Sequence, residues 1–236
     1  MSRRRSLGQI LWPHDEQARQ IAIEWAKAIV EQALGLVWCG FDHMQQNELS
    51  VALELDEDRP EQLERELTQW HAQAVLLVWA RAGGGYTSFV PGHELHEVAS
   101  RKGGKAMPPS NDMGFTHRRY KRWILPVEAK VLPSAKALAE YLEDVNLKYV
   151  GGVAAPIVGE GGMIGYLLAG SADDVFDGLT ARLGQRLRRL ERFEERAHRT
   201  SSHVRTNAPQ LRIHHMVMSC ASLGLHGSTR SERSAR

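Results

Sequence analysis

The sequence predicts an α/β protein in which helices flank a central mixed β-sheet. Segments whose apolar residues recur every three or four positions alternate along the chain with short segments whose apolar residues recur every second position. The 236 residues, of which 42% are hydrophobic, suffice for one full-sized core. We therefore expect an N-terminal helical extension over residues 1–44, a main domain over 45–222 and a flexible tail over 223–236.

Helices dominate the expected structure of the first third of the chain. Apolar residues at helical spacing predict a helix over about residues 14–36, with Gly35 and Gly40 at its end. A second helical region is expected over 48–55, and a third helix begins at Pro60, because proline is tolerated in the first turn. The apolar face of this third helix consists of Leu63, Leu67, Trp70 and Ala74.

The middle of the chain is expected to supply the first strands. Gly, Pro, His and Ser are frequent between Tyr86 and Asn111, which indicates a long loop that contains one short strand. Strands are expected at residues 113–115 and 123–132, the latter with alternate apolar residues on one face. A helix capped by Ser134 follows. Its apolar positions are Ala135, Leu138, Leu142, Val145 and Tyr149.

The last third of the chain is expected to complete the sheet. Apolar segments predict strands over residues 150–158 and 163–169 and again over 211–218. Charged and polar residues with helical periodicity predict a polar helix over 173–199 between them.

Charge is distributed unevenly along the sequence. The formal net charge is only +2, so bulk charge by itself indicates no polyanionic partner. Basic residues nevertheless cluster between His117 and Arg122, in the sequence between the carboxylates considered next. We expect phosphate contacts from this cluster, because cations beside a site for nucleic acid neutralise the backbone. The side chains concerned are Arg118, Arg119, Lys121 and Arg122.

Three residues in and beside the strand at 123–132 have the chemistry of a metal site. Residues two apart in a strand point to the same side, so Glu128 and Lys130 project together. A Glu-x-Lys tripeptide is common and is normally solvated, but an ionised pair is costly in a strand made otherwise of Ile, Leu, Val and Ala. An adjacent antiparallel strand can bring Asp112 within a few ångströms of Glu128. Two carboxylates with room for water suit Mg²⁺, for which Mn²⁺ can substitute.

Such an ion would bind a scissile phosphate and activate water for attack. Lys130 would hold or deprotonate that water and offset charge developing on phosphorus. The backbone carbonyl of Ala129 offers one further ligand.

These residues resemble a known family. Asp-Met-Gly-Phe at residues 112–115, a basic connector, and Leu-Pro-Val-Glu-Ala-Lys-Val-Leu at 125–132 resemble the core of the PD-(D/E)XK, or restriction-endonuclease-like, nucleases. The segment at 149–166 is similar to uncharacterised bacterial proteins of that superfamily, which are often encoded near phage-defence or mobile elements. The resemblance covers about residues 112–170 and excludes the flanking parts.

The resemblance implies a restriction-endonuclease-like mixed sheet and a Mg²⁺-dependent endonuclease. In it, Asp112 and Glu128 would bind the metal ion and Lys130 would assist hydrolysis. Asn111 stands where the pattern has proline, a position that coordinates nothing. Many such nucleases carry a further acidic residue on an upstream helix. Its candidates here are Glu48, Glu64 and Glu66.

Two classes of function remain open. The first is an endonuclease that acts on DNA, in phage or mobile-element defence; the alternative is a non-catalytic nucleic-acid-binding or assembly subunit whose site residues persist as a structural ion-pair cluster. The sequence does not decide whether the substrate is DNA or RNA. It also leaves open whether the chain forms a homodimer or binds a partner subunit from a defence operon. The longest apolar run, at 74–80, is too short to cross a bilayer, and Cys39 and Cys220 match no metal or redox spacing. A cytoplasmic protein without a membrane partner is expected.

Overall fold

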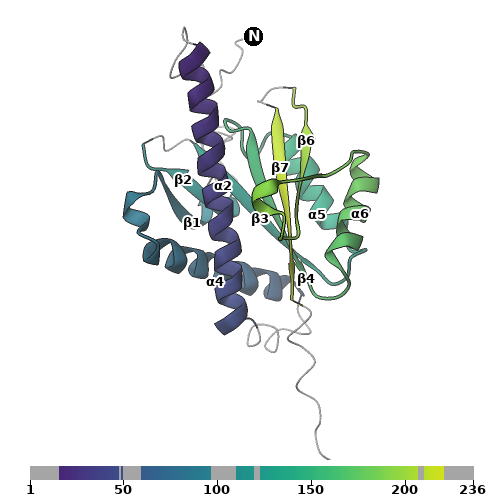
Figure 1. The fold of residues 1–236 in the computed structure, drawn as a ribbon. Coiled ribbons are helices and arrows are strands. Elements are labelled where there is room, and N and C mark those ends of the chain that lie inside the picture. The colour runs from purple at the N-terminus through teal and green to yellow at the C-terminus, as the bar shows by residue number, and fades with distance from the viewer. Residues whose placement is uncertain are drawn as a thin grey trace, which may run out of the picture.

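A seven-stranded mixed β-sheet forms the centre of the molecule (Figure 1). The computed structural model describes residues 16–47, 49, 60–96, 110–119, 123–206 and 210–220, with side chains from residue 27 onward except that of Pro60. The strand order is β1-β2-β3-β4-β7-β6-β5, and neighbours are parallel only at β3/β4 and β4/β7. The strands are β1 (Phe89–His96), β2 (Ser110–His117), β3 (Ile124–Leu132), β4 (Glu160–Leu167), β5 (Arg188–Arg189), β6 (His198–His203) and β7 (Leu211–Ser219).

Helices cover both faces of this sheet, so the predicted α/β class with a mixed sheet is confirmed. The helix α2 crosses in front of the sheet in Figure 1, and contacts of α2 and α4 with β4 and β6 place both on one face. Contacts of α5 and α6 with β6 and β7 place these helices on the other. The helices are α2 (Glu16–Asn47), α4 (Pro60–Arg81), α5 (Ala139–Asp144), α6 (Ala172–Leu183), the π-helical turn η3 (Val145–Val150) and the 3₁₀ turns η1 (Gly84–Tyr86) and η4 (Glu191–Phe193).

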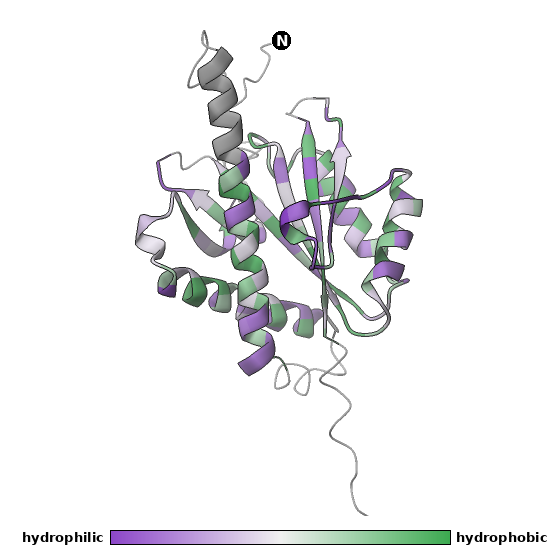
Figure 2. Ribbon diagram, in the orientation of Figure 1, coloured by the Kyte–Doolittle hydropathy of each residue, from purple (hydrophilic) through white to green (hydrophobic). Residues whose placement is uncertain are grey.

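The helix α4 begins at Pro60, and its predicted apolar face is confirmed. Leu63, Leu67 and Ala74 are buried in the core, and Trp70 packs against it. Both α2 and α4 are banded green and purple in Figure 2, as expected for helices that bury one face. No helix in the described part of the chain is long and apolar enough to span a membrane.

The first helix is longer than predicted, because its two glycines do not end it. Gly35 and Gly40 lie inside α2, which continues to Asn47. At Gly40 an added Cβ would lie 2.5 Å from Val75 Cγ2 and 2.9 Å from the Val75 backbone nitrogen. This glycine therefore lets α4 approach α2 closely. The predicted helical region at 48–55 lies outside the described residues except for Leu49, which is helical and buried.

The strand predicted over 150–158 is wrong. This segment forms turns and bends around the buried Arg205, whose guanidinium donates hydrogen bonds to backbone carbonyls. The shortest two reach the carbonyls of Ala155 at 3.0 Å and Val158 at 3.1 Å. The partner that shapes the segment lies some fifty residues away in sequence, so local apolar content could not reveal it.

The long polar helix predicted over 173–199 is also wrong. Instead, α6 ends at Leu183, because Gly184 takes a left-handed conformation with φ of 63°. The chain then forms β5, η4 and β6. The exposed arginines of this stretch mimic the solvated face of a helix, while Leu187 and Phe193 are buried.

Other boundaries differ in detail. Ser134 lies in a turn and does not cap a helix; α5 begins only at Ala139. The strand at 123–132 is confirmed as β3, the strand at 113–115 as part of the longer β2, and those at 163–169 and 211–218 correspond to β4 and β7.

Candidate active site

The candidate site lies where β2 separates from β3. The antiparallel pairing runs from Thr116↔Ile124 to Met113↔Val127, and the next rung of this register would place Asp112 opposite Glu128. There the strands part. On the edge of β3 that β2 leaves, the N–H of Ala129 donates to Asp112 Oδ2 at 2.7 Å.

The helix α4 fills the same edge one step further along. The N–H of Val131 donates to Glu64 Oε2 at 3.0 Å, and Lys130 Nζ donates to Glu64 Oε1 at 2.6 Å. Of the three upstream acidic candidates, the structure thus brings Glu64 to the site. Glu66 makes no such contact in the described structure, and Glu48 lies outside the described residues.

Glu128 is fully buried on β3. Its Oε2 accepts a hydrogen bond from Lys148 Nζ at 2.6 Å, whereas its Oε1 is buried without a hydrogen-bond partner in the described structure. Burial, followed by repulsion from Asp112, raises the pKa of Glu128 to about 8, and the ion pair with Lys148 offsets only part of this. Glu128 is therefore a carboxyl group that lacks sufficient positive charge around it.

The two lysines are held by carboxylates. Burial by itself lowers the pKa of Lys130, but its hydrogen bond and charge pairing with Glu64 raise that pKa above its ordinary value. For Lys148, burial is likewise outweighed by Glu128 and then Asp144, which raise its pKa well above the usual range. Both lysines therefore remain cationic at neutral pH.

Asp144, at the end of α5, links the two lysines. Its Oδ2 lies 3.1 Å from Lys148 Nζ and 3.6 Å from Lys130 Nζ. Both contacts are ion pairs, because within the described part of the chain this buried oxygen lacks hydrogen-bond geometry to any donor. The result is an unbroken series of charges, Glu64–Lys130–Asp144–Lys148–Glu128.

We call these five residues together with Asp112 the charge cluster. With every group ionised, its four carboxylates carry −4 and its two lysines +2, which leaves −2. A partly buried excess of two negative charges is the electrostatic requirement that a divalent cation satisfies.

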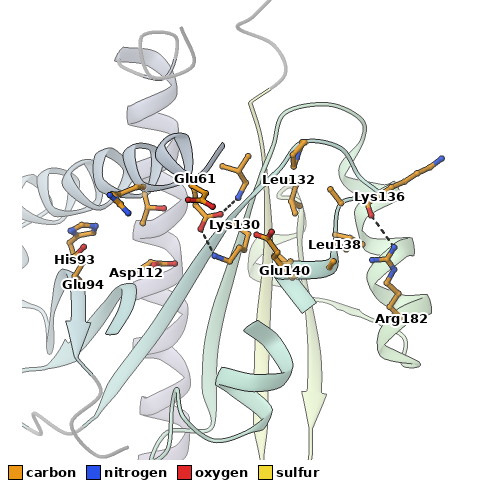
Figure 3. Close-up of a pocket in the computed structure, with 18 residues that line it drawn as sticks. Glu61, His93, Glu94, Asp112, Lys130, Leu132, Lys136, Leu138, Glu140 and Arg182 are labelled. Carbon is orange, nitrogen blue, oxygen red and sulfur yellow. Dashed lines mark hydrogen bonds and ion pairs between the residues drawn. The ribbon is translucent and has the colours of Figure 1, made fainter. Parts of the chain in front are cut away.

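A pocket of about 740 Å³ opens onto the cluster (Figure 3). Asp112 and Lys130 lie in its middle, with His93 and Glu94 of β1 toward one end and Lys136 and Arg182 toward the other. Glu128 does not line the pocket, and its side chain is fully buried.

The predicted basic cluster is only partly placed, and not beside this pocket. Arg118 follows the far end of β2, where it donates to the Gly84 carbonyl at 2.9 Å and lies over the Trp79 ring at 5.5 Å. Arg119 is exposed in the same turn. Arg118 is six residues beyond Asp112 along an extended strand, a span of about 20 Å. The expectation that it adjoins the carboxylates is therefore corrected for Arg118 and Arg119; Lys121 and Arg122 lie outside the described residues.

Sequence reasoning missed Asp144 and Lys148. Their spacing of four residues is a signal for an ion pair on a helix, but nothing local connects them with β3. The connection is made by Tyr149, whose hydroxyl donates to the carbonyls of Gly162 at 2.5 Å and Pro126 at 3.2 Å.

The donor set fits a hard cation in chemistry but not in its present arrangement. Carboxylate oxygens are the ligands that Mg²⁺ prefers, and Glu128 Oε1 is a buried acceptor for which the described residues offer no donor. In a strand the N–H and C=O of one residue point to the same side, so the Ala129 carbonyl also faces the gap. Within the described residues, however, no three His, Cys, Asp or Glu side chains are gathered closely enough to hold a metal ion. Lysines occupy the space between the carboxylates.

Comparison of the chain with protein-family models, with curated proteins and with solved structures found no match. The class that fold and site define is thus an α/β protein with a buried carboxylate–lysine cluster beneath a charged pocket.

Proposed function

We propose that this chain is a metal-dependent nuclease with a restriction-endonuclease-like fold, which hydrolyses phosphodiester bonds in DNA. The observation that carries the proposal is the charge cluster at the gap between β2 and β3, in which carboxyl groups outnumber lysines by two and Glu128 Oε1 is buried without a hydrogen-bond partner among the described residues. Asp112 and Glu128 would hold Mg²⁺ or Mn²⁺, and the ion would supply charge neutralisation at the scissile phosphate and an activated water.

Lys130 has the role of a fixed cation. Its ammonium group is held by Glu64 at 2.6 Å and remains protonated, so it would orient water and stabilise charge on phosphorus rather than accept a proton. Asp112 has a second task, because its carboxylate also satisfies the Ala129 N–H and so keeps the open edge of β3 in place.

The nucleic acid would lie along the pocket. Lys136 and Arg182 line one end, about where a phosphate backbone running past Lys130 would pass. Each such contact would release counterions, so binding should weaken with salt and do so less steeply in a Lys136→Ala/Arg182→Ala variant. An Arg118→Ala variant is the matched control, since Arg118 contacts Gly84 and Trp79 instead.

The decisive experiment is cleavage of single-stranded, duplex and supercoiled DNA, and of RNA, with Mg²⁺ or Mn²⁺ against EDTA. Wild type should cut at least one DNA substrate only with metal, and Asp112→Asn should not. The neutral Asn keeps an oxygen that accepts from Ala129, so the fold should survive. Glu61→Gln, a change at an exposed acid of the same pocket, should cut normally.

A second function has one observation in its favour. Every lysine of the charge cluster is already paired, and Asp112 and Glu64 already satisfy strand-edge amides. A non-catalytic nucleic-acid-binding or assembly subunit would need no more than this. Binding of DNA or RNA by a wild type that cuts none of the substrates would favour this alternative.

A further inference from the structure

We propose that Lys148 is a built-in counter-cation: it neutralises Glu128, moves to Asp144 when a divalent ion binds, and thereby sets the metal affinity of the site. The proposal rests on the proposed function for the identity of the ion. The lysine and both of its partners are defined independently by their contacts.

The position of Lys148 fits this role. Its Nζ lies 2.6 Å from Glu128 Oε2 and 3.1 Å from Asp144 Oδ2, so one ammonium group already touches two carboxylates. The side chain of Glu128 is fully buried, whereas that of Lys148 is 35% exposed. The lysine can therefore leave Glu128 without crossing the core.

The backbone that carries Lys148 is fixed rather than adaptable. The six-residue helix α5 widens into the π-helical turn η3, a form found often at functional positions. Tyr149 pins this turn through its hydroxyl bonds to Gly162 and Pro126. Its ring lies directly on β4, where an added Cβ at Gly161 would be 2.3 Å from Tyr149 Cε1. With the turn held in this way, movement is left to the lysine side chain.

Electrostatics makes the two occupants compete. A Mg²⁺ ion bound to a carboxylate sits about 2.1 Å from its oxygen, and an ammonium group hydrogen-bonded to the same carboxylate would be only a few ångströms from that ion. Repulsion between the two cations would weaken metal binding unless Lys148 shifts. Among the described residues Asp144 is the alternative partner already in contact with Lys148, and its Oδ2 has no full hydrogen bond there.

Two substitutions should therefore change metal affinity in opposite directions. Lys148→Gln retains a hydrogen-bond donor for Glu128 but removes the charge, so Mn²⁺ should bind more tightly. Asp144→Asn removes the acceptor charge for the displaced lysine, so Mn²⁺ should bind more weakly. Each change should be roughly fivefold or more, the effect of one unit charge a few ångströms away in a water-like dielectric.

The experiment is titration of the full-length protein with Mn²⁺, followed by the electron paramagnetic resonance signal of the free ion and by calorimetry, without nucleic acid. Lys27→Gln, at an exposed lysine of α2 outside this pocket, is the matched control and should bind Mn²⁺ within about twofold of wild type. Lys148→Met serves as a second variant, and circular dichroism establishes that each protein is folded.

The outcomes are distinct. Tighter binding by Lys148→Gln with weaker binding by Asp144→Asn supports the proposal. Equal affinities in wild type and both Lys148 variants, with binding lost in Asp112→Asn, would overturn the counter-cation while leaving the metal site intact. Weaker binding by folded Lys148 variants would show that Lys148 only supports Glu128, and would overturn it too. Absence of Mn²⁺ binding from every folded protein would remove the proposed metal-dependent function together with this inference.

Discussion

Two buried polar networks lie in one sheet, and they differ in how completely their hydrogen bonds and charges are satisfied. On β6 and β7, Trp38 Nε1 donates to His198 Nδ1 at 3.2 Å, so His198 Nε2 carries a proton and donates to His214 Nδ1 at 3.0 Å. His214 Nε2 then donates to Glu160 Oε2 at 3.0 Å. Each donor in this series meets one acceptor.

The charge cluster at β2 and β3 lacks this completeness. Its carboxylates outnumber its lysines by two, and Glu128 Oε1 is buried without a partner in the described structure. The histidine network consists of neutral rings in fixed tautomers, whereas the charge cluster consists of ions whose positions depend on one another. A complete neutral network stabilises a fold; an incomplete charged one suits a ligand of opposite charge.

The largest expected effect is a loss of stability in acid that originates in the histidines. Burial lowers the pKa of His71 to about 4, of His215 to about 3 and of His198 to about 2. Below the ordinary value of 6.5 the unfolded chain binds three protons that the folded protein excludes, so the free energy of unfolding should fall as pH decreases. Glu128 has the opposite effect: its pKa rises from 4.5 to about 8, so between these pH values the folded protein binds one proton that the unfolded chain does not.

The difference of two protons corresponds to about 3 kcal/mol per pH unit near pH 5. Urea denaturation at half-unit steps from pH 4.5 to 8.5 measures it. Stability should be greatest near neutrality, and a flat profile below pH 6.5 would contradict the assignment of neutral buried histidines.

The next effect concerns chemistry at the charge cluster. Lys130→Ala should retain DNA binding yet cut roughly 100- to 1,000-fold more slowly, as expected when one preorganised charge-stabilising group is removed. Single-turnover cleavage and binding measured in Ca²⁺ separate the two steps. Equal losses of binding and cutting would mean that Lys130 contributes to affinity alone.

Interrupting a separate pair of buried hydrogen bonds, those of His71 on α4, should cost stability. His71 lies between the Tyr166 hydroxyl at 2.9 Å and the Val37 carbonyl at 2.7 Å. In His71→Leu both groups lose a buried partner, so the free energy of unfolding should fall by about 2–4 kcal/mol. His96→Ala, at an exposed position on β1, should change it by less than about 0.5 kcal/mol. Chemical denaturation of both variants provides the measurement.

Adding the missing charge should stabilise the incomplete network. At Mn²⁺ concentrations 100 times the dissociation constant, a ligand specific for the folded state contributes about 2.7 kcal/mol, or about 5–10 °C in Tm for a chain of this size. Differential scanning fluorimetry should show this shift in wild type and little of it in Asp112→Asn. The same shift in both proteins would remove Asp112 from the site.

The smallest effect should come from removing a charge from the cluster. Burial raises the pKa of Glu128 to about 8, so its raised pKa stabilises the fold below pH 4.5 and this contribution is lost as pH rises through 8. Glu128→Gln escapes that loss, so it should be within about 1 kcal/mol of wild type at pH 6 and gain relative to wild type at pH 9. Chemical denaturation of both proteins at the two pH values measures this difference. If Glu128→Gln instead loses stability relative to wild type as pH rises, Glu128 is stabilised as an anion.

The fold could be predicted where apolar residues recur at a regular spacing along a helix or strand and that face packs against the core. Strand β3, the start of α4 at Pro60 and the inward face of α4 were all anticipated, because period two and period 3.6 are local properties. Predictions failed where a distant partner overrode local pattern. Gly40 accommodates Val75 instead of ending α2, and Arg205 folds residues 150–158 into turns.

The candidate site shows the same division. Strand alternation and antiparallel register were enough to place Glu128 and Lys130 on β3 with Asp112 beside them. Glu64 was one of three equal candidates by sequence, and only the packing of α4 against β3 selected it.

The sequence by itself therefore determined the strands β2, β3, β4 and β7 and the shared face of Glu128 and Lys130, because these follow from the alternation of side chains along an extended chain. Only the tertiary structure decided which lysine neutralises which carboxylate. Lys130 pairs with Glu64, which is 66 residues away in sequence, and therefore does not neutralise Glu128. Lys148, 20 residues beyond Glu128, pairs with Glu128 instead. Ion pairing depends on distance in space, and with four carboxylates and two lysines local spacing permits several pairings of similar chemistry.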